Sequence, residues 1–134
     1  MPELFKISPS LEDYLEAILQ LTLSNEKVRV TDLADEMKVA KSSVNQALNK
    51  LLDLKLIEHQ KYGPLELTPI GREKAERVSK RHQILKSFLQ DVLGVDHVNA
   101  EADACLIEHH LSAVTMEKLV DFLETRLGLE TVKS

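Results

Sequence analysis

The clearest fold signal lies in residues 31–54, which read TDLADEMKVAKSSVNQALNKLLDL. Apolar residues recur at helical spacing in two runs, which are separated by a link of two residues. Thr31 is predicted to cap the first helix, over residues 32–38, because a Thr side chain can accept a hydrogen bond from the exposed N–H groups. The second helix is expected over residues 41–54. Two helices joined by so short a turn are typical of a helix-turn-helix unit that reads DNA.

The flanking segments complete this unit. Ser8 and Pro9 predict the start of an earlier helix, and residues 28–30 are predicted to form a short strand. Residues 56–60 and 65–68 are two short apolar runs, and the Gly-Pro pair between them indicates a hairpin. The order helix, strand, helix, helix, hairpin is that of a winged helix-turn-helix, in which the hairpin is the wing.

The rest of the chain is predicted to be helical. A long helix should begin at Pro69 and run towards Gly94, and two more are expected over residues 98–111 and 115–127. The predicted fold class is therefore mainly α, with an N-terminal winged helix-turn-helix domain, a small β-hairpin wing and a C-terminal helical domain.

The composition is that of a globular protein. The 134 residues have room for two small domains that share a long helix, and we predict these domains over residues 1–74 and 75–134. No apolar run approaches the roughly 18 residues of a membrane span, and the first residues lack the pattern of a secretory signal. The single cysteine cannot form an internal disulfide. These features predict a cytoplasmic protein with no membrane partner.

Charge is unevenly distributed along the chain. The net charge is −5, yet residues 26–82 hold 12 Lys and Arg against 9 Asp and Glu, whereas the remainder holds 5 against 13. A basic DNA-reading module joined to an acidic, cation-binding module would give this pattern. Scattered solvated charge explains the same count equally well.

The predicted second helix of the helix-turn-helix has a polar side that could read DNA. Its residues are Lys41, Ser42, Ser43, Asn45, Gln46, Asn49 and Lys50. Amide and hydroxyl groups hydrogen-bond base edges and Lys meets phosphate, and Lys61 and Tyr62 in the wing could grip the neighbouring backbone. A solvated helix face is the commoner explanation of any one of them, but the whole ordered set favours DNA binding.

Ligand-type side chains recur at helical spacing in the predicted C-terminal domain. Cys105, Glu108 and His109 stand at positions i, i+3 and i+4, which share one side of a helix. Asp13 and Glu16 likewise stand at i and i+3, in the predicted helix that begins at Ser8 and Pro9. With one imidazole of the long helix, the candidate metal ligands on three helices are Asp13, Glu16, His82, Cys105, Glu108 and His109. Singly, each has an ordinary reading as a surface carboxylate, a surface imidazole or a core thiol.

Several motifs carry a family resemblance. They are SLEDYLEAI from Ser10, AKSSV from Ala40, LELTPIGR from Leu65, the Arg-His pair at 81–82 and EHHLS from Glu108. In this order, over nearly the whole chain, they resemble the metal-dependent repressors of the diphtheria-toxin-repressor family. In length the chain is similar to the two-domain manganese transport regulator branch, with no room after Ser134 for a third domain.

The resemblance implies a set of metal ligands. Five residues of this chain match the ligand types of the manganese branch: Asp13, Glu16, His82, Glu108 and His109. Cys105 replaces a carboxylate of that branch and resembles the iron-sensing branch, which usually has methionine where this chain has Asp13. Glu101 matches an ancillary ligand position of the iron branch, and Lys86 stands where a carboxylate is expected. Mn²⁺ and Fe²⁺ both remain open, and a thiolate would also bind Zn²⁺ or Co²⁺ in vitro.

The resemblance also implies a function. It predicts a metal-responsive repressor of metal-uptake genes that binds a palindromic operator as a homodimer, through a C-terminal domain for metal binding and dimerisation. A cation held by ligands of both domains would set the spacing of the two recognition helices near one turn of DNA, roughly 34 Å. An enzyme is disfavoured because no separate nucleophile or phosphate loop is present. A winged-helix regulator of a non-metal signal remains the alternative.

Overall fold

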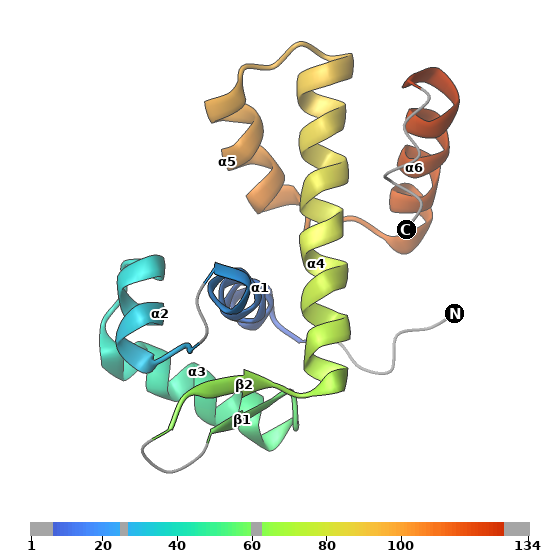
Figure 1. Ribbon diagram of the computed structural model, residues 1–134. Coiled ribbons are helices and arrows are strands. Elements are labelled where there is room, and N and C mark those ends of the chain that lie inside the picture. Colours follow the sequence, from blue (N-terminus) through green and yellow to red (C-terminus); the bar gives the residue numbers. More distant parts are fainter. Residues whose placement is uncertain (1–6, 25–26, 60–62, 128–134) are drawn as a thin grey trace. The chain divides into compact units, whose positions relative to one another are not determined.

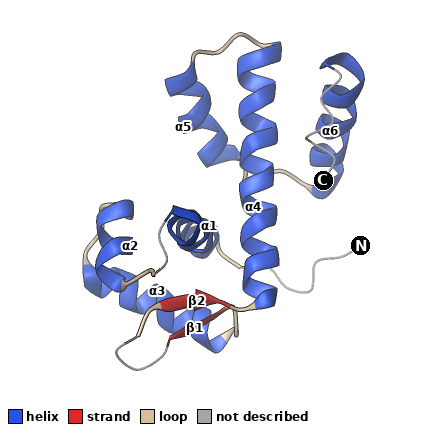
Figure 2. Ribbon diagram, in the orientation of Figure 1, coloured by secondary structure: helices blue, strands red, loops and turns tan. Residues whose placement is uncertain are grey.

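The structure is a computed structural model that describes residues 7–24, 27–59 and 63–127. The chain divides into two compact units, Met1–Glu76 and Arg77–Ser134. Figures 1 and 2 show that helices dominate both units and that the strands form one small hairpin. The predicted mainly α fold class is confirmed.

The first unit is a winged helix-turn-helix. Its elements are α1 (Pro9–Ser24), α2 (Val30–Met37), α3 (Lys41–Asp53), β1 (Ile57–His59) and β2 (Leu65–Leu67). Ser8 caps α1, since its Oγ accepts a hydrogen bond from the amide of Leu11 at 3.2 Å. One continuous apolar core joins the three helices to the hairpin, and Leu15, Ile18 and Leu33 are fully buried in it.

The turn between α2 and α3 depends on a left-handed residue. Lys38 ends α2 with φ of 58°, and the amide of Val39 donates to the carbonyl of Ala34 at 3.1 Å. The predicted cap at Thr31 is wrong, because α2 begins one residue earlier, at Val30. Asp32 stabilises this start instead, as its carboxylate accepts the backbone N–H of Arg29 at 2.9 Å.

The wing is an antiparallel hairpin in which Ile57 pairs with Leu67 and His59 with Leu65. The predicted strand over residues 28–30 is reduced to an isolated bridge between Val28 and Leu65, because Val30 already belongs to α2. The amide of Leu65 donates to the carbonyl of Val28 at 2.7 Å. This bridge ties the hairpin to the chain that precedes α2.

Helix α4 (Pro69–Ser87) begins in the first unit and ends in the second. Thr68 caps it, since its Oγ1 accepts the amide of Gly71 at 3.1 Å while the same hydroxyl donates to the carbonyl of Lys55 at 2.7 Å. Beyond Ser87 the chain continues as the π-helical turn η1 (Phe88–Val92) rather than as regular α-helix. The helical path stops at Gly94, whose φ is 72°.

The second unit packs α5 (His97–Ile107) and α6 (Ala113–Leu127) against the later part of α4. Figure 1 shows these two helices on either side of α4. Asp96 caps α5, accepting the amide of Asn99 at 3.0 Å, and Ser112 caps α6, accepting the amide of Thr115 at 3.2 Å. The predicted helix over residues 98–111 is too long at its C-terminal end, because α5 ends at Ile107.

Apolar side chains of α5 and α6 fall into two groups. Met116 and Leu123 are buried in the core of their own unit, so they are unavailable for contact with a second copy of the chain. Leu106 and Val114 are 68% and 66% exposed. Within the described residues no helix is long and apolar enough to span a membrane.

Candidate functional site

Helix α3 presents a polar face to solvent. Its apolar face, including Val44 and Leu48, is buried in the core of the first unit. The seven side chains predicted to read DNA are all exposed: Lys41, Ser42, Ser43, Asn45, Gln46, Asn49 and Lys50. Lys61 and Tyr62, the two wing residues predicted to contact DNA, lie outside the described residues. The first unit therefore offers a helix with exposed amide, hydroxyl and ammonium groups on the side away from its core.

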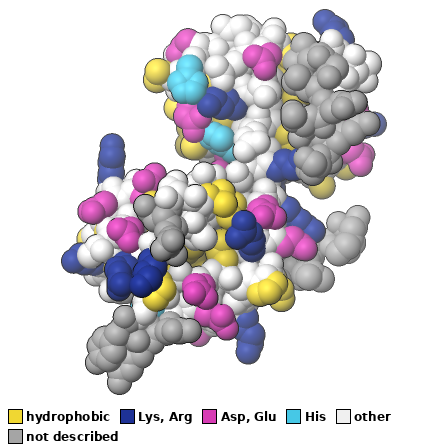
Figure 3. All heavy atoms as spheres, in the orientation of Figure 1, with side chains coloured by type: hydrophobic (Ala, Val, Ile, Leu, Met, Phe, Trp, Pro, Cys, Tyr) yellow, Lys and Arg dark blue, Asp and Glu magenta, His cyan; other side chains and the backbone are white. Residues whose placement is uncertain are grey.

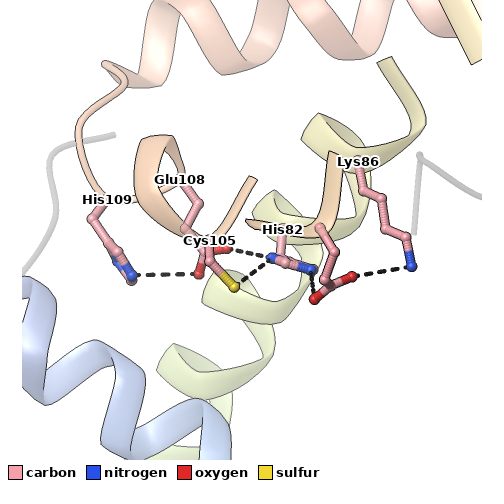
Figure 4. A network of polar contacts seen from close by, with 6 residues as sticks. His82, Lys86, Cys105, Glu108 and His109 are labelled. Carbon is pink, nitrogen blue, oxygen red and sulfur yellow. Dashed lines mark hydrogen bonds and ion pairs between the residues drawn. The ribbon is translucent and has the colours of Figure 1, made fainter. Parts of the chain in front are cut away.

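A cluster of ligand-type side chains lies in the second unit. His82 extends from α4 and Cys105 from α5, and Glu108 directly follows the last residue of α5. One ligand atom from each, an imidazole nitrogen, the sulfur and a carboxylate oxygen, lies within 4.8 Å of the other two. Figure 4 shows the three side chains pointing towards one another. At this spacing the three donor atoms could surround one cation.

Glu108 is the buried centre of this cluster, with an exposed fraction of 0%. Its Oε1 lies 2.6 Å from Nδ1 of His82. Its Oε2 is also buried, accepts no hydrogen bond from the described residues, and lies 3.5 Å from Nε2 of His109. A buried carboxylate is costly unless it is paired, bonded to a metal or neutralised. An unsatisfied carboxylate oxygen beside an imidazole and a thiol therefore fits a divalent cation.

His109 reaches the cluster in a different way from the one that the sequence predicted. Because α5 ends at Ile107, His109 follows the helix instead of sharing a face with Cys105. Its side chain is only 4% exposed, whereas His110 is exposed. The turn after α5 thus brings the first imidazole, and not the second, beside Glu108.

A second pair of charged side chains adjoins His82. Glu101 places Oε2 2.8 Å from Nε2 of His82, and its Oε1 lies 3.1 Å from Nζ of Lys86. Desolvation raises the pKa of Glu101, but the hydrogen bond from Lys86 and the charges of His82 and Lys86 outweigh it, so its pKa lies below the ordinary value. Figure 3 shows histidine, acidic and basic side chains close together on the drawn face of the second unit.

Asp13 and Glu16, the remaining predicted ligands, belong to the first unit. They stand three residues apart on α1, where Asp13 is exposed and Glu16 is half-buried. The structure thus brings together His82, Cys105, Glu108 and His109 within one unit.

Sequence reasoning missed the part that Lys86 has beside this cluster. Lys86 seemed only to replace an expected carboxylate, but it is the partner of Glu101. The four-residue spacing from His82 was the available signal, because residues at i and i+4 are neighbours on a helix surface. The contact itself also required α5 to be packed against α4.

Two family descriptions match consecutive parts of the chain. Residues 6–65 match the iron dependent repressor N-terminal DNA binding domain. Residues 68–126 match the iron dependent repressor metal binding and dimerisation domain. The polar face of α3 lies in the first match, and His82, Cys105, Glu108 and His109 lie in the second.

Relatives described as transcriptional regulators agree with these matches. The HTH-type transcriptional regulator MntR of Listeria welshimeri is 37% identical, over 94% of this chain and 95% of its own. An uncharacterized HTH-type transcriptional regulator of Methanocaldococcus jannaschii is 35% identical, over 88% of this chain and 95% of its own. Both are described as transcriptional regulators rather than enzymes.

Solved structures share the fold. The manganese regulator SloR superposes with a TM-score of 0.78 at 30% identity, and covers 88% of this chain and 55% of its own. A manganese-dependent transcriptional repressor in complex with manganese gives a TM-score of 0.77 at 29% identity, and covers 88% of this chain and 52% of its own. The chain thus spans about half the length of these two solved regulators.

Proposed function

This chain belongs to the iron-dependent repressor family, and from that premise we propose that it represses metal-uptake genes, with Mn²⁺ or Fe²⁺ as its co-repressor. It is a metal-responsive, DNA-binding transcriptional regulator, and its family's C-terminal domain both binds metal and dimerises. We also propose a cytoplasmic location, which is consistent with action on DNA.

The observation that carries the proposal is the cluster of His82, Cys105 and Glu108, whose ligand atoms lie within 4.8 Å of one another. Glu108 adds a buried oxygen that accepts no hydrogen bond from the part of the chain that the structure describes. When bound, the ion supplies positive charge that neutralises buried carboxylate. Each of the three side chains contributes a different donor, and all three must be deprotonated at the ligating atom to bind an ion.

The donor set is compatible with more than one metal. Carboxylate oxygens suit Mn²⁺, imidazole suits Fe²⁺ among other ions, and the Cys105 thiolate favours softer ions. The relatives named for manganese favour Mn²⁺ as the cellular ion. The related regulator ScaR has been solved with Zn²⁺ and with Cd²⁺, so we expect Zn²⁺ and Co²⁺ to bind this chain in vitro as well.

We propose Asp13, Glu16 and His109 as further ligands. His109 is supported by its buried side chain 3.5 Å from Glu108. Asp13 and Glu16 enter from the sequence motif of α1, where they stand at i and i+3. An ion that recruited carboxylates of the first unit would couple metal binding to DNA binding, and by linkage DNA would then raise the affinity for metal by the same factor.

The DNA-binding half of the proposal depends on α3. We propose that Ser43, Asn45 and Gln46 contact base edges and that Lys41 and Lys50 contact phosphates, in an operator whose palindrome matches a two-fold dimer. Ser42 and Asn49 share the same exposed face. Lys61 and Tyr62 remain candidates for phosphate contacts from the wing.

One experiment tests this function directly. DNA that binds the full chain is first selected from random duplexes in the presence of Mn²⁺, and fluorescence anisotropy then measures affinity with Mn²⁺, Fe²⁺, Zn²⁺ or a chelator. We expect tight binding with Mn²⁺ or Fe²⁺ and strong weakening with chelator. Equal affinity with and without metal would instead support a winged-helix regulator of another signal. Glu108→Gln should bind the selected DNA weakly whichever metal ion is present. His110→Gln, which changes an exposed neighbouring imidazole, should bind it as the wild type does.

A further inference from the structure

Glu101 of α5 links two side chains of α4. Its Oε2 lies 2.8 Å from Nε2 of His82 and its Oε1 lies 3.1 Å from Nζ of Lys86. His82 and Lys86 are four residues apart, so they lie on the same side of α4. We call Lys86, Glu101 and His82 the outer triad; Figure 4 shows Lys86 on the far side of His82 from Cys105 and Glu108.

We propose that the outer triad is a positioning device for a single metal ion: Glu101, fixed by Lys86, keeps Nε2 of His82 as a hydrogen-bond donor, so that only Nδ1 can ligate. The inference rests on the proposed function and deepens it. It assigns positioning roles to Lys86 and Glu101, and it specifies which nitrogen of His82 binds the ion and how many ions His82 serves.

The distances around the imidazole support this assignment. Nδ1 lies 2.6 Å from Oε1 of Glu108 and 3.7 Å from the sulfur of Cys105, so it faces the candidate ligands. Nε2 lies on the other side of the ring, 2.8 Å from Oε2 of Glu101. A metal-ligating imidazole commonly donates its other N–H to a carboxylate, which fixes the ring and raises its basicity.

Lys86 is needed because Glu101 is only partly held by the fold. The Glu101 side chain is 44% exposed, so water competes for its carboxylate, whereas the Lys86 side chain is 29% exposed. The ammonium fixes the carboxylate oxygen that His82 does not use. It also places a tethered positive charge beside Glu101, and that charge repels a second cation from the outer side of His82.

The first test observes the imidazole itself. In the full chain with ¹⁵N-labelled histidine and loaded with diamagnetic Zn²⁺, two-bond ¹H–¹⁵N NMR distinguishes protonated from metal-bound ring nitrogens, and His82→Gln assigns the signals. We expect His82 to carry its proton on Nε2 and the ion on Nδ1. The reverse assignment would overturn the proposal, and a merely structural role for Glu101 would not specify which nitrogen is protonated.

The second test measures affinity and stoichiometry by the electron paramagnetic resonance signal of free Mn²⁺. Glu101→Ala and Glu101→Gln should weaken Mn²⁺ binding by about 10–100-fold, the usual effect of losing an outer partner of a ligand. Lys86→Gln should also weaken Mn²⁺ binding, whereas Lys86→Arg, which keeps the positive charge, should bind Mn²⁺ as the wild type does. Lys118→Gln, which removes the same charge from an exposed site on α6, is the matched control and should match the wild type.

The outcomes separate this inference from the proposed function. If the wild-type chain bound no divalent ion, both the proposed function and the positioning role would be wrong. A wild type that binds Mn²⁺ tightly while Glu101→Ala and Lys86→Gln leave the affinity unchanged would overturn the positioning role alone. The same is true of a second ion per subunit that is lost on Glu101→Ala, because Glu101 would then be a ligand.

Discussion

Nδ1 of His82 lies 2.6 Å from Oε1 of Glu108, and this contact joins α4 to the residue that directly follows α5. The two residues are 26 positions apart in the chain, and Glu108 is fully buried. Their contact turns two separate helix features into one candidate metal centre.

Removing either member of this pair should abolish tight metal binding. Glu108→Gln keeps the size of the side chain but loses the negative charge, and His82→Gln loses the imidazole. We expect each to reduce Mn²⁺ affinity by more than the roughly 10–100-fold that follows loss of an outer partner. Competition with a chromophoric chelator measures this effect. An unchanged affinity in both variants would place the metal elsewhere.

Gly71 should not tolerate a side chain. A Cβ built there would lie 1.8 Å from the carbonyl oxygen of Leu56, which is backbone and cannot rotate away. We expect Gly71→Ala to destabilise the chain by at least about 1–3 kcal/mol, the usual effect of overpacking. Urea unfolding measures the free energy of unfolding. Gln83→Ala, at an exposed position of the same helix, should leave it nearly unchanged.

Asp96 should titrate below its ordinary range. The side-chain hydrogen bond with Asn99, and then the backbone hydrogen bond with the same residue, lower the pKa of Asp96. A carboxyl group with a lowered folded pKa adds stability above its unfolded pKa and loses it as the pH falls through the folded value. The cap of α5 should therefore weaken only in acid.

An NMR titration of the Asp96 carboxyl group tests this prediction. Asn99→Ala should return its pKa towards the ordinary value, because the largest cause is removed. Asp96→Asn should keep the cap of α5 without titrating, and Asp96→Ala should lower the thermal midpoint at neutral pH. An ordinary pKa in the wild type would contradict the expectation.

Gln46 and Lys50 should have different effects on DNA binding. Both are exposed on α3, but an amide can read a base whereas an ammonium meets phosphate. Gln46→Ala should reduce the binding free energy for the selected operator by about 1–3 kcal/mol and that for random duplex by little. Lys50→Ala should weaken binding to the operator and to random duplex alike, and should reduce the slope of log affinity against log salt concentration by about one. Anisotropy titrations at several salt concentrations distinguish the two, and equal losses on both duplexes for Gln46→Ala would refute base reading.

The local features of the chain were readable without coordinates. Ser8, the hydrophobic periodicity of α3 and the Gly-Pro bend depend on contacts between residues a few positions apart, so they could be inferred from spacing alone. The family motifs likewise stand in linear order. These features were sufficient to predict a winged helix-turn-helix followed by helices.

Packing determined what spacing could not predict. The sequence placed Cys105, Glu108 and His109 on one helix, but α5 ends at Ile107, and His109 approaches Glu108 through the turn that follows. The sequence predicted Thr31 as the cap of α2, but the carboxylate of Asp32 stabilises the start of this helix. In both cases a boundary shifted by a few residues, because the end of a helix depends on hydrogen bonds and burial that local preference only partly controls.

The amino-acid sequence was sufficient to predict the helical pattern, the winged domain and the types of candidate metal donor, because each depends on neighbours along the chain. The meeting of His82 with Glu108, and of Lys86 with Glu101, arises only when α5 packs against α4. Contacts over such separations depend on how the core closes around Leu85 and Ala104, and no pattern of adjacent residues encodes that.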